Sequence, residues 1–318
     1  MDLFVVLAEL DGTGVPLGYL LASVDARDQS SRLADAGAMT CILRQFLQPI
    51  KSAGFMPKFF HCDKDKSEIS AIKKILPEVT IRLCYWHAKR AIRNKLRENK
   101  KARSQNHYHP NEAQALVPKL EICWGAYPTR RPGDHQYGRC ECNSSKVSFE
   151  ESGSMEISTV SERDIVLVMF SRHFNMHSMI PDQNGTYRSA EQIRSDCINK
   201  IYVWCYSRKY SRLWAYLFVN WYAPDQWKLW ARSASHSGIP VLKTTMIVES
   251  HWRRIKHDYL HRYSRPGMDL VVSILTSLVV PEAVEKMNAI LSKVFRKATA
   301  AWRKFFKKHW DDPQHLLV

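Results

Sequence analysis

The pattern of hydrophobic and polar residues in the first part of the chain is typical of strands at first and of a helix afterwards. Residues 3–7 and 16–22 are short apolar runs, and the segment between them contains Asp11-Gly12. An Asp-Gly pair between two such runs predicts a β-hairpin with a tight turn. From residue 31 to residue 53, apolar positions recur at three- and four-residue spacing, which predicts an amphipathic helix.

Strands and helices are then expected to alternate. Residues 58–62 and 79–83 are short apolar runs typical of buried strands. Between them, residues 67–76 have one apolar helical face and end before Pro77, and residues 86–101 predict a basic helix. The order hairpin, helix, strand, helix, strand, helix indicates an α/β unit.

The pattern breaks after residue 101. Residues 102–165 are rich in proline and then in Gly, Ser and Glu, which predicts a mobile loop at about 125–165. From residue 165 to residue 232 the chain is helical and aromatic, and this spacing favours core packing over base stacking with single-stranded nucleic acid. The aromatic positions are Trp204, Tyr206, Trp214, Phe218, Trp221, Trp227 and Trp230.

Helical periodicity continues to the end of the sequence. One helix is expected from about residue 244, and residues 297–310 predict a basic amphipathic helix. The chain thus divides into residues 1–101, an insertion at 102–240, and C-terminal helices at 241–318. The apolar face of the helix after residue 244 is expected to carry Met246, Ile247, Trp252, Ile255 and Leu260.

The net charge of the chain indicates what kind of partner it binds. The chain carries 47 Lys and Arg against 31 Asp and Glu, a formal net charge of +16. Such an excess favours a polyphosphate partner, because each cation placed on a phosphate releases a counterion; a solvated basic surface without a partner is the alternative. The start of the sequence is not typical of a signal peptide, no apolar run is long enough for a bilayer, and the cysteines are scattered. These features predict a soluble protein of a reducing compartment, the nucleus, with no membrane partner.

Asp63 is the first candidate for chemistry, because it follows the apolar run 58–62. A carboxylate at a strand end can hold a divalent cation that activates water against a phosphodiester. A turn or helix-cap role is the alternative for Asp63. For the neighbouring Asp65 we expect the cap role, since it directly precedes the predicted helix.

Glu249 is the second candidate and lies near the start of a basic helix. It shares a helix face with Arg253 and Lys256, so an intrahelical ion pair is the ordinary interpretation. A carboxylate beside cations would also suit a metal-bridged phosphate.

Cys84 and His87 have the spacing of two zinc ligands. A structural zinc needs four ligands, and the other cysteines do not supply a matching pair, so we do not expect one. A core cysteine and a histidine at a helix start are the simpler interpretation.

Residues 61–92, HCDKDKSEISAIKKILPEVTIRLCYWHAKRAI, resemble the central motif of the MULE (Mutator-like element) transposase domain. That motif combines a strand-end acid with a later L-C-x-W-H at the start of a helix. Residues 244–266 resemble the segment with the family's last acidic residue, and residues 4–22 resemble its second and third strands. The resemblance extends over residues 1–101 and 200–310.

The resemblance implies an RNase H-like mixed sheet with flanking helices, interrupted by a mostly helical insertion. It also implies DDE-type cleavage and transfer of DNA strands with Mg²⁺ or Mn²⁺ held by three carboxylates. Asp63 matches the second acidic residue and Glu249 the third, while Cys84 and His87 match a C-x-x-H motif near the active site. The expected DNA contacts come from basic residues of the two helices beside these positions: Lys89, Arg90, Arg93, Arg253, Arg254 and Lys256.

The sequence departs from the family at its start. The family's first acidic residue lies on a strand before the hairpin, whereas this hairpin begins at about residue 3, so we expect the first strand to be missing. Asp11 is no substitute, because Asp before Gly at a hairpin tip is a turn residue. Two functions therefore remain open: a transposase, and an inactive, truncated or domesticated remnant that binds DNA through basic helices. A homo-oligomer also remains open. An RNA-binding module ranks last, since no RNP, KH or OB signature is present.

Overall fold

The structure is a computed structural model that describes residues 2–22, 36–97, 108, 110–116, 134–135, 138–139, 160–235, 238 and 242–292. The chain divides into two compact units. The terminal unit contains residues 1–27 and 246–318, and the central unit contains residues 28–245. The fold is mixed α/β, with the described strands in three separate two-stranded sheets, and each unit is described by itself.

The terminal unit begins with the predicted hairpin. Strands β1 (Asp2–Leu10) and β2 (Thr13–Ala22) pair antiparallel. The turn residues Asp11 and Gly12 have φ angles of 48° and 73°, the left-handed conformation that a two-residue hairpin turn requires. The hairpin prediction is confirmed, and Asp11 is a turn residue.

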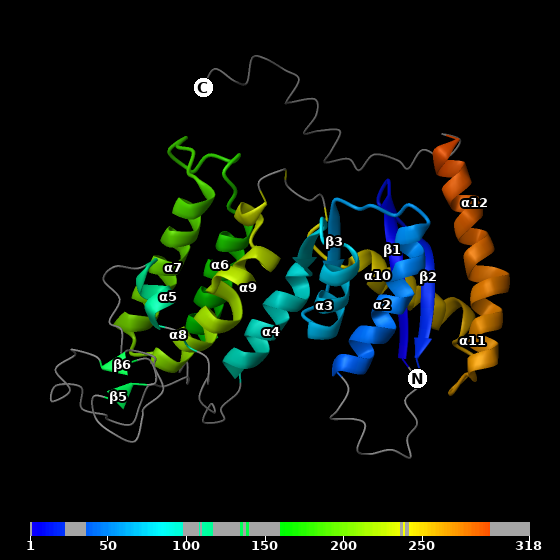
Figure 1. The fold of residues 1–318 in the computed structure, drawn as a ribbon, viewed down its shortest axis with the longest axis horizontal. Coiled ribbons are helices and arrows are strands. Elements are labelled where there is room, and N and C mark those ends of the chain that lie inside the picture. Colours follow the sequence, from blue (N-terminus) through cyan, green and yellow to red (C-terminus); the bar gives the residue numbers. More distant parts are fainter. Residues whose placement is uncertain are drawn as a thin grey trace. The chain divides into compact units, whose positions relative to one another are not determined.

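Helices cover this hairpin within the terminal unit. They are α10 (Met246–Arg254), the π-helical turn η3 (Ile255–Tyr259), α11 (Met268–Ile274), the π-helical turn η4 (Leu275–Val279) and α12 (Val280–Leu291). Helices α10 and α12 both pack on β2 (Figure 1). The buried core joins the helices to apolar residues of the hairpin: Ile255, Val271, Ile274, Leu275 and Val279 with Leu3, Tyr19 and Leu21.

One expected core position of α10 is wrong. Met246 is 65% exposed, because it is the first residue of the helix and lies before the turns that pack on the hairpin. Ile255 is buried as expected, and Trp252 and Leu260 pack against the same cluster. Ile247 lies close to Gly14 of β2, where a Cβ would collide with its Cγ2.

The central unit starts with the predicted alternation of helices and strands. Its first elements are α2 (Ala36–Ser52), β3 (Phe59–Cys62), α3 (Lys66–Ile75), β4 (Thr80–Leu83) and α4 (Tyr85–Arg97). Strands β3 and β4 are parallel and joined through α3, and α2 packs against α3. The predicted order of elements is confirmed over these residues.

Asp65 is the N-cap of α3. Its Oδ1 accepts hydrogen bonds from the backbone amides of Ser67 and Glu68, at 2.7 and 3.1 Å. The expected cap role of Asp65 is therefore confirmed, and the acid that remains for chemistry at the end of β3 is Asp63.

The segment after α4 is described in part. It contains α5 (Pro110–Gln114) and the two-residue strands β5 (Asp134–His135) and β6 (Gly138–Arg139). Helix α6 (Val160–Asn175) begins before residue 165, so the expected loop at 125–165 is wrong for its last residues. The polar residues that indicated a loop form the first turn of the helix, where an acid such as Glu162 is favourable. Most of the remaining loop prediction, and the basic helix expected at 297–310, lie outside the described residues.

An aromatic core fills the rest of the central unit. Its elements are α7 (Ala190–Ser207), α8 (Ser211–Leu217), the π-helical turn η1 (Phe218–Tyr222), α9 (Pro224–Trp230) and the 3₁₀ turn η2 (Arg232–Ala234). The largest side chains are almost completely buried, which confirms core packing; they include Trp214, Trp221, Trp230, Tyr222, Phe170 and Phe218.

Two of the buried indole groups in this core have well-defined hydrogen-bond partners. Trp230 donates to the carbonyl of Trp221 at 2.6 Å, and Trp214 donates to the hydroxyl of Tyr108 at 2.8 Å. Satisfied donors make large aromatic residues stable in a core. Two of the expected aromatic positions are less buried: Tyr206 is 41% exposed, and Trp204 is half-buried.

Candidate functional site

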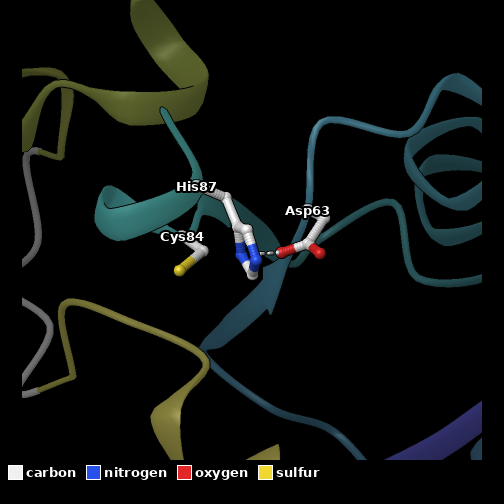
Figure 2. A group of neighbouring side chains, drawn as sticks. All are labelled: Asp63, Cys84 and His87. Carbon is white, nitrogen blue, oxygen red and sulfur yellow. Dashed lines mark ion pairs between the residues drawn. The ribbon is translucent and has the colours of Figure 1, made fainter. Parts of the chain in front are cut away.

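Three residues that the sequence singled out meet at the carboxyl ends of β3 and β4. The two strands are parallel, so the residues that follow them lie at the same edge of the sheet. Asp63 follows β3, Cys84 follows β4, and His87 lies in the first turn of α4 (Figure 2). The ligand atoms of all three side chains lie within 4.8 Å of one another.

Asp63 and His87 are in direct contact. Nδ1 of His87 lies 2.7 Å from Oδ1 of Asp63, and the side chains are 25% and 49% exposed, respectively. The imidazole therefore fixes one carboxylate oxygen, while the Asp63 side chain remains accessible from solvent.

Backbone hydrogen bonds hold Cys84 beside this pair. Its amide donates to the carbonyl of Cys62 at 2.9 Å and extends the parallel ladder by one residue. Its carbonyl accepts from the amide of Ala88 at 2.9 Å, so Cys84 also begins the hydrogen-bonding pattern of α4. The thiol is buried between a strand end and a helix start.

Residues 243–245 lie against the same helix start. The amide of Tyr85 donates to the carbonyl of Lys243 at 2.9 Å, and the amide of Thr245 donates to Sγ of Cys84 at 3.3 Å. The contact of this segment with Cys84 was not predicted from the sequence, because residues 161 positions apart in the chain carry no local signal of contact.

Glu68 is a second acid near Asp63 that the sequence did not single out as a site residue. Burial first, and then the charges of Asp65 and Asp63, raise the pKa of the Glu68 carboxyl to about 7. The backbone amide of Asp63 donates a hydrogen bond to this carboxyl, which acts in the opposite direction. The signal was present in the sequence, since an acid three residues after an N-cap often turns back toward the helix start.

Lys64 also has a defined position next to Asp63. Its Nζ lies 4.0 Å from the centre of the Trp221 ring and donates to the carbonyl of Asn220 at 2.7 Å. These contacts tie the loop after β3 to the aromatic core, which restricts the backbone of the adjacent Asp63.

Glu249 belongs to the terminal unit and is exposed at the start of α10. Its predicted convergence with Asp63 stays a prediction. Glu249 and Arg253 lie four residues apart in α10 and share a helix face as expected, whereas Lys256 lies in η3, where the π-helical turn changes the residue spacing.

Arg254, one of the expected DNA contacts, is engaged within the terminal unit. Its guanidinium pairs with Glu282 and lies 3.9 Å from Asp258, and it donates to the Tyr259 hydroxyl at 3.0 Å. Because these acids already neutralise its positive charge, Arg254 is a poorer phosphate ligand than Arg253, which is exposed in the same helix.

Helix α4 separates an apolar face from a basic one. Ala88, Ile92 and Leu96 are buried at four-residue spacing, which leaves the basic residues on the remaining faces. They include Lys89, Arg90 and Arg93. Arg90 is exposed and lies over the ring of the exposed Trp86, at 5.0 Å from its centre.

The implied Mg²⁺ or Mn²⁺ can be compared with the donors that the structure brings together. Mg²⁺ takes oxygen ligands almost exclusively. The described part of the central unit offers one carboxylate, one imidazole and one thiol at this position. This set does not fit Mg²⁺, and it provides only one of the three carboxylates that the resemblance implies.

One curated protein is similar to the chain. The sequence is 23% identical over 305 residues to the mating-type protein ALPHA3 of Kluyveromyces lactis. The match covers 92% of this chain but 30% of that protein, so the chain spans less than a third of its relative's length. No family model matches the sequence, and no solved structure matches it. Among the described helices, none is long and apolar enough to cross a membrane.

Proposed function

We propose that this chain is derived from a transposase of the MULE type, a protein of the nucleus that acts on DNA. In this proposal the described elements are parts of an RNase H-like core, and the activity is metal-dependent cleavage and transfer of DNA strands. The observation that supports it best is the position of Asp63. The residue lies at the end of a parallel strand, in contact with His87, and His87 lies in the first turn of the basic helix α4.

The residues present can contribute to strand cleavage in distinct ways. A divalent cation held by carboxylates would lower the barrier to attack of water or a 3′-hydroxyl on a phosphodiester. Asp63 would supply one such carboxylate, which His87 orients, and the others would come from outside the group of Asp63, Cys84 and His87. The exposed Arg90 can bind a neighbouring phosphate and hold the strand next to Asp63.

Glu249 is proposed as a further acid of the same site. The resemblance supports this role, since Glu249 matches the family's third acidic residue.

A second candidate function is an inactive remnant that binds DNA without cleaving it. The observation in its favour is the donor set at the strand ends, where one carboxylate is accompanied by a thiol and an imidazole. In that case the basic residues of α4, including Arg90 and Arg93, carry the whole function by binding phosphates.

Nicking of a supercoiled plasmid tests the first candidate. The full chain is incubated with plasmid and with Mg²⁺ or Mn²⁺, and nicked circles are measured on a gel. We expect Asp63→Asn to abolish nicking and Asp65→Asn to retain it, because asparagine still caps α3. Nicking that survives Asp63→Asn would contradict a catalytic role for this residue.

Fluorescence anisotropy with a labelled DNA duplex tests the second candidate. We expect Arg90→Ala with Arg93→Ala to reduce the slope of log affinity against log salt by about 1 for each phosphate that is no longer neutralised. Lys73→Ala with Lys74→Ala removes the same charge from exposed positions of α3 and is the matched control. DNA binding without nicking supports the remnant, whereas a chain that binds no DNA excludes both candidates.

A further inference from the structure

We propose that Asp63, Cys84 and His87 form a binding site for a borderline transition-metal cation of the zinc class. The site is the one at the ends of β3 and β4 that the proposed function uses, but the cation is of the zinc class and not Mg²⁺ or Mn²⁺. A role of this cation in DNA cleavage rests on the proposed function. A thiol, an imidazole and a carboxylate are the three ligand types that zinc takes in proteins.

The distances between the donors suit one cation. All three ligand atoms lie within 4.8 Å of one another, and the closest pair, Nδ1 of His87 and Oδ1 of Asp63, is 2.7 Å apart. Bonds of about 2.0–2.1 Å in a tetrahedral arrangement place nitrogen and oxygen ligands about 3.3 Å apart. The Asp63–His87 pair therefore needs to widen by about half an ångström, and the wider separations, up to 4.8 Å, need to close toward the roughly 3.6 Å expected between sulfur and nitrogen or oxygen ligands.

The frame around Cys84 favours a thiolate ligand. The Thr245 amide donates to Sγ at 3.3 Å, and a donor of this kind orients a coordinating sulfur and stabilises its negative charge. Cys84 also directly precedes the first residue of α4, where the positive end of the helix dipole favours an anion. Both features act on this cysteine, whereas Cys41 is exposed on the side of α2.

Three protein ligands leave a coordination position open. A structural zinc site is closed by four protein ligands, whereas a site with three retains a position for water or substrate. The half-exposed side chain of Asp63 leaves the site accessible from solvent. The cation would thus be positioned to bind an exchangeable oxygen, such as one from a phosphodiester.

An ion pair beside a buried cysteine is the competing explanation, and titration with Co²⁺ separates the two. The full chain, without DNA, is titrated with Co²⁺ as a spectroscopic substitute for zinc, and the sulfur-to-cobalt absorption in the near-ultraviolet is recorded. We expect one equivalent to bind, with an absorption that added Zn²⁺ removes and that added Mg²⁺ does not.

Substitution of each proposed ligand tests which side chains bind the metal. Cys84→Ser should remove the sulfur-to-cobalt absorption, and His87→Gln or Asp63→Asn should weaken binding by more than about tenfold. Cys41→Ser is the matched control and should leave the spectrum unchanged. Thermal unfolding without metal checks that each variant folds, and Cys84→Ala replaces Cys84→Ser if the serine variant does not.

The outcomes are distinct from those of the proposed function. An absorption that persists in Cys84→Ser, or is lost only in Cys41→Ser, would overturn the metal site, and so would the absence of any such absorption in the unsubstituted chain. Plasmid nicking plays no part in this measurement. If the chain binds Co²⁺ through Cys84 but cleaves no DNA, the result supports the metal site and contradicts the proposed transposase activity.

Discussion

Nδ1 of His87 lies 2.7 Å from Oδ1 of Asp63. Asp63 directly follows β3, whereas His87 belongs to α4, and the chain passes through α3 and β4 between them. The contact exists because β3 and β4 are parallel and end at the same edge. It joins the two halves of the segment on which the proposed MULE origin rests, and it places an imidazole on the acid proposed as catalytic.

Replacement of His87 tests whether this contact serves function or stability. Both side chains are partly exposed, so we expect His87→Gln to change the free energy of unfolding by less than about 1 kcal/mol. Plasmid nicking should fall, because the carboxylate of Asp63 loses its fixed orientation, while DNA affinity stays the same. A loss of several kcal/mol measured by urea unfolding would instead indicate a structural role. His261→Gln, in the terminal unit, is the control substitution.

Asp65 offers a prediction on stability alone. Asp65→Ala removes the acceptor for two amides at the start of α3, and we expect a loss of about 1 kcal/mol in the free energy of unfolding. Asp65→Asn should cost little, because its side-chain oxygen can accept the same bonds. Equal losses in the two variants, measured by urea unfolding, would exclude capping as the role of Asp65.

Two tryptophans are expected to respond in opposite ways. Trp230 is buried, stacks on Phe170 at a ring distance of 4.3 Å and donates to the Trp221 carbonyl, so Trp230→Ala should destabilise by about 3–5 kcal/mol. Trp86 is 48% exposed, so Trp86→Ala should stay within about 0.5 kcal/mol. Circular dichroism during urea unfolding measures both, and a large loss for Trp86→Ala would show that its ring is part of the core.

Glu68 should make stability depend on pH. Its pKa is about 7 in the folded protein against an ordinary value of 4.5, chiefly because it is buried. Between these values the folded chain binds more protons than the unfolded chain, so this group lowers stability as pH rises through that range. Glu68→Gln removes the effect, since its side chain takes no charge.

The measurement compares the unfolding free energy of Glu68→Gln with that of the unsubstituted chain at about pH 5 and about pH 8. We expect the variant to gain relative stability at the higher pH. The exposed Glu78 of the same unit provides the control, Glu78→Gln. A difference that is the same at both pH values would contradict the raised pKa of Glu68.

Much of the local structure could be predicted from the sequence, because local signals decide it. The Asp11-Gly12 turn, the end of α3 before Pro77 and the Asp65 cap each depend on residues a few positions apart. The same holds for the apolar spacing of α4. The start of α6 was placed too late, because polar residues in a first helical turn have the composition of a loop.

The candidate site was predicted only in part. The sequence paired Cys84 with His87 by their spacing, and only the resemblance placed them near Asp63. The sequence carried no sign that residues 243–245 lie against Cys84. It also missed the raised pKa of Glu68, since burial is a property of packing and not of composition.

The sequence by itself determined which residue types stand at the strand ends, the period of each helix and the excess of positive charge. Tertiary structure decided which of those residues meet. The parallel pairing of β3 and β4 brings a carboxylate, a thiol and an imidazole within 4.8 Å of one another, across 24 positions from Asp63 to His87. Such proximity depends on strand pairing and on the crossover through α3 that makes the two strands parallel, and no spacing rule along the chain encodes it.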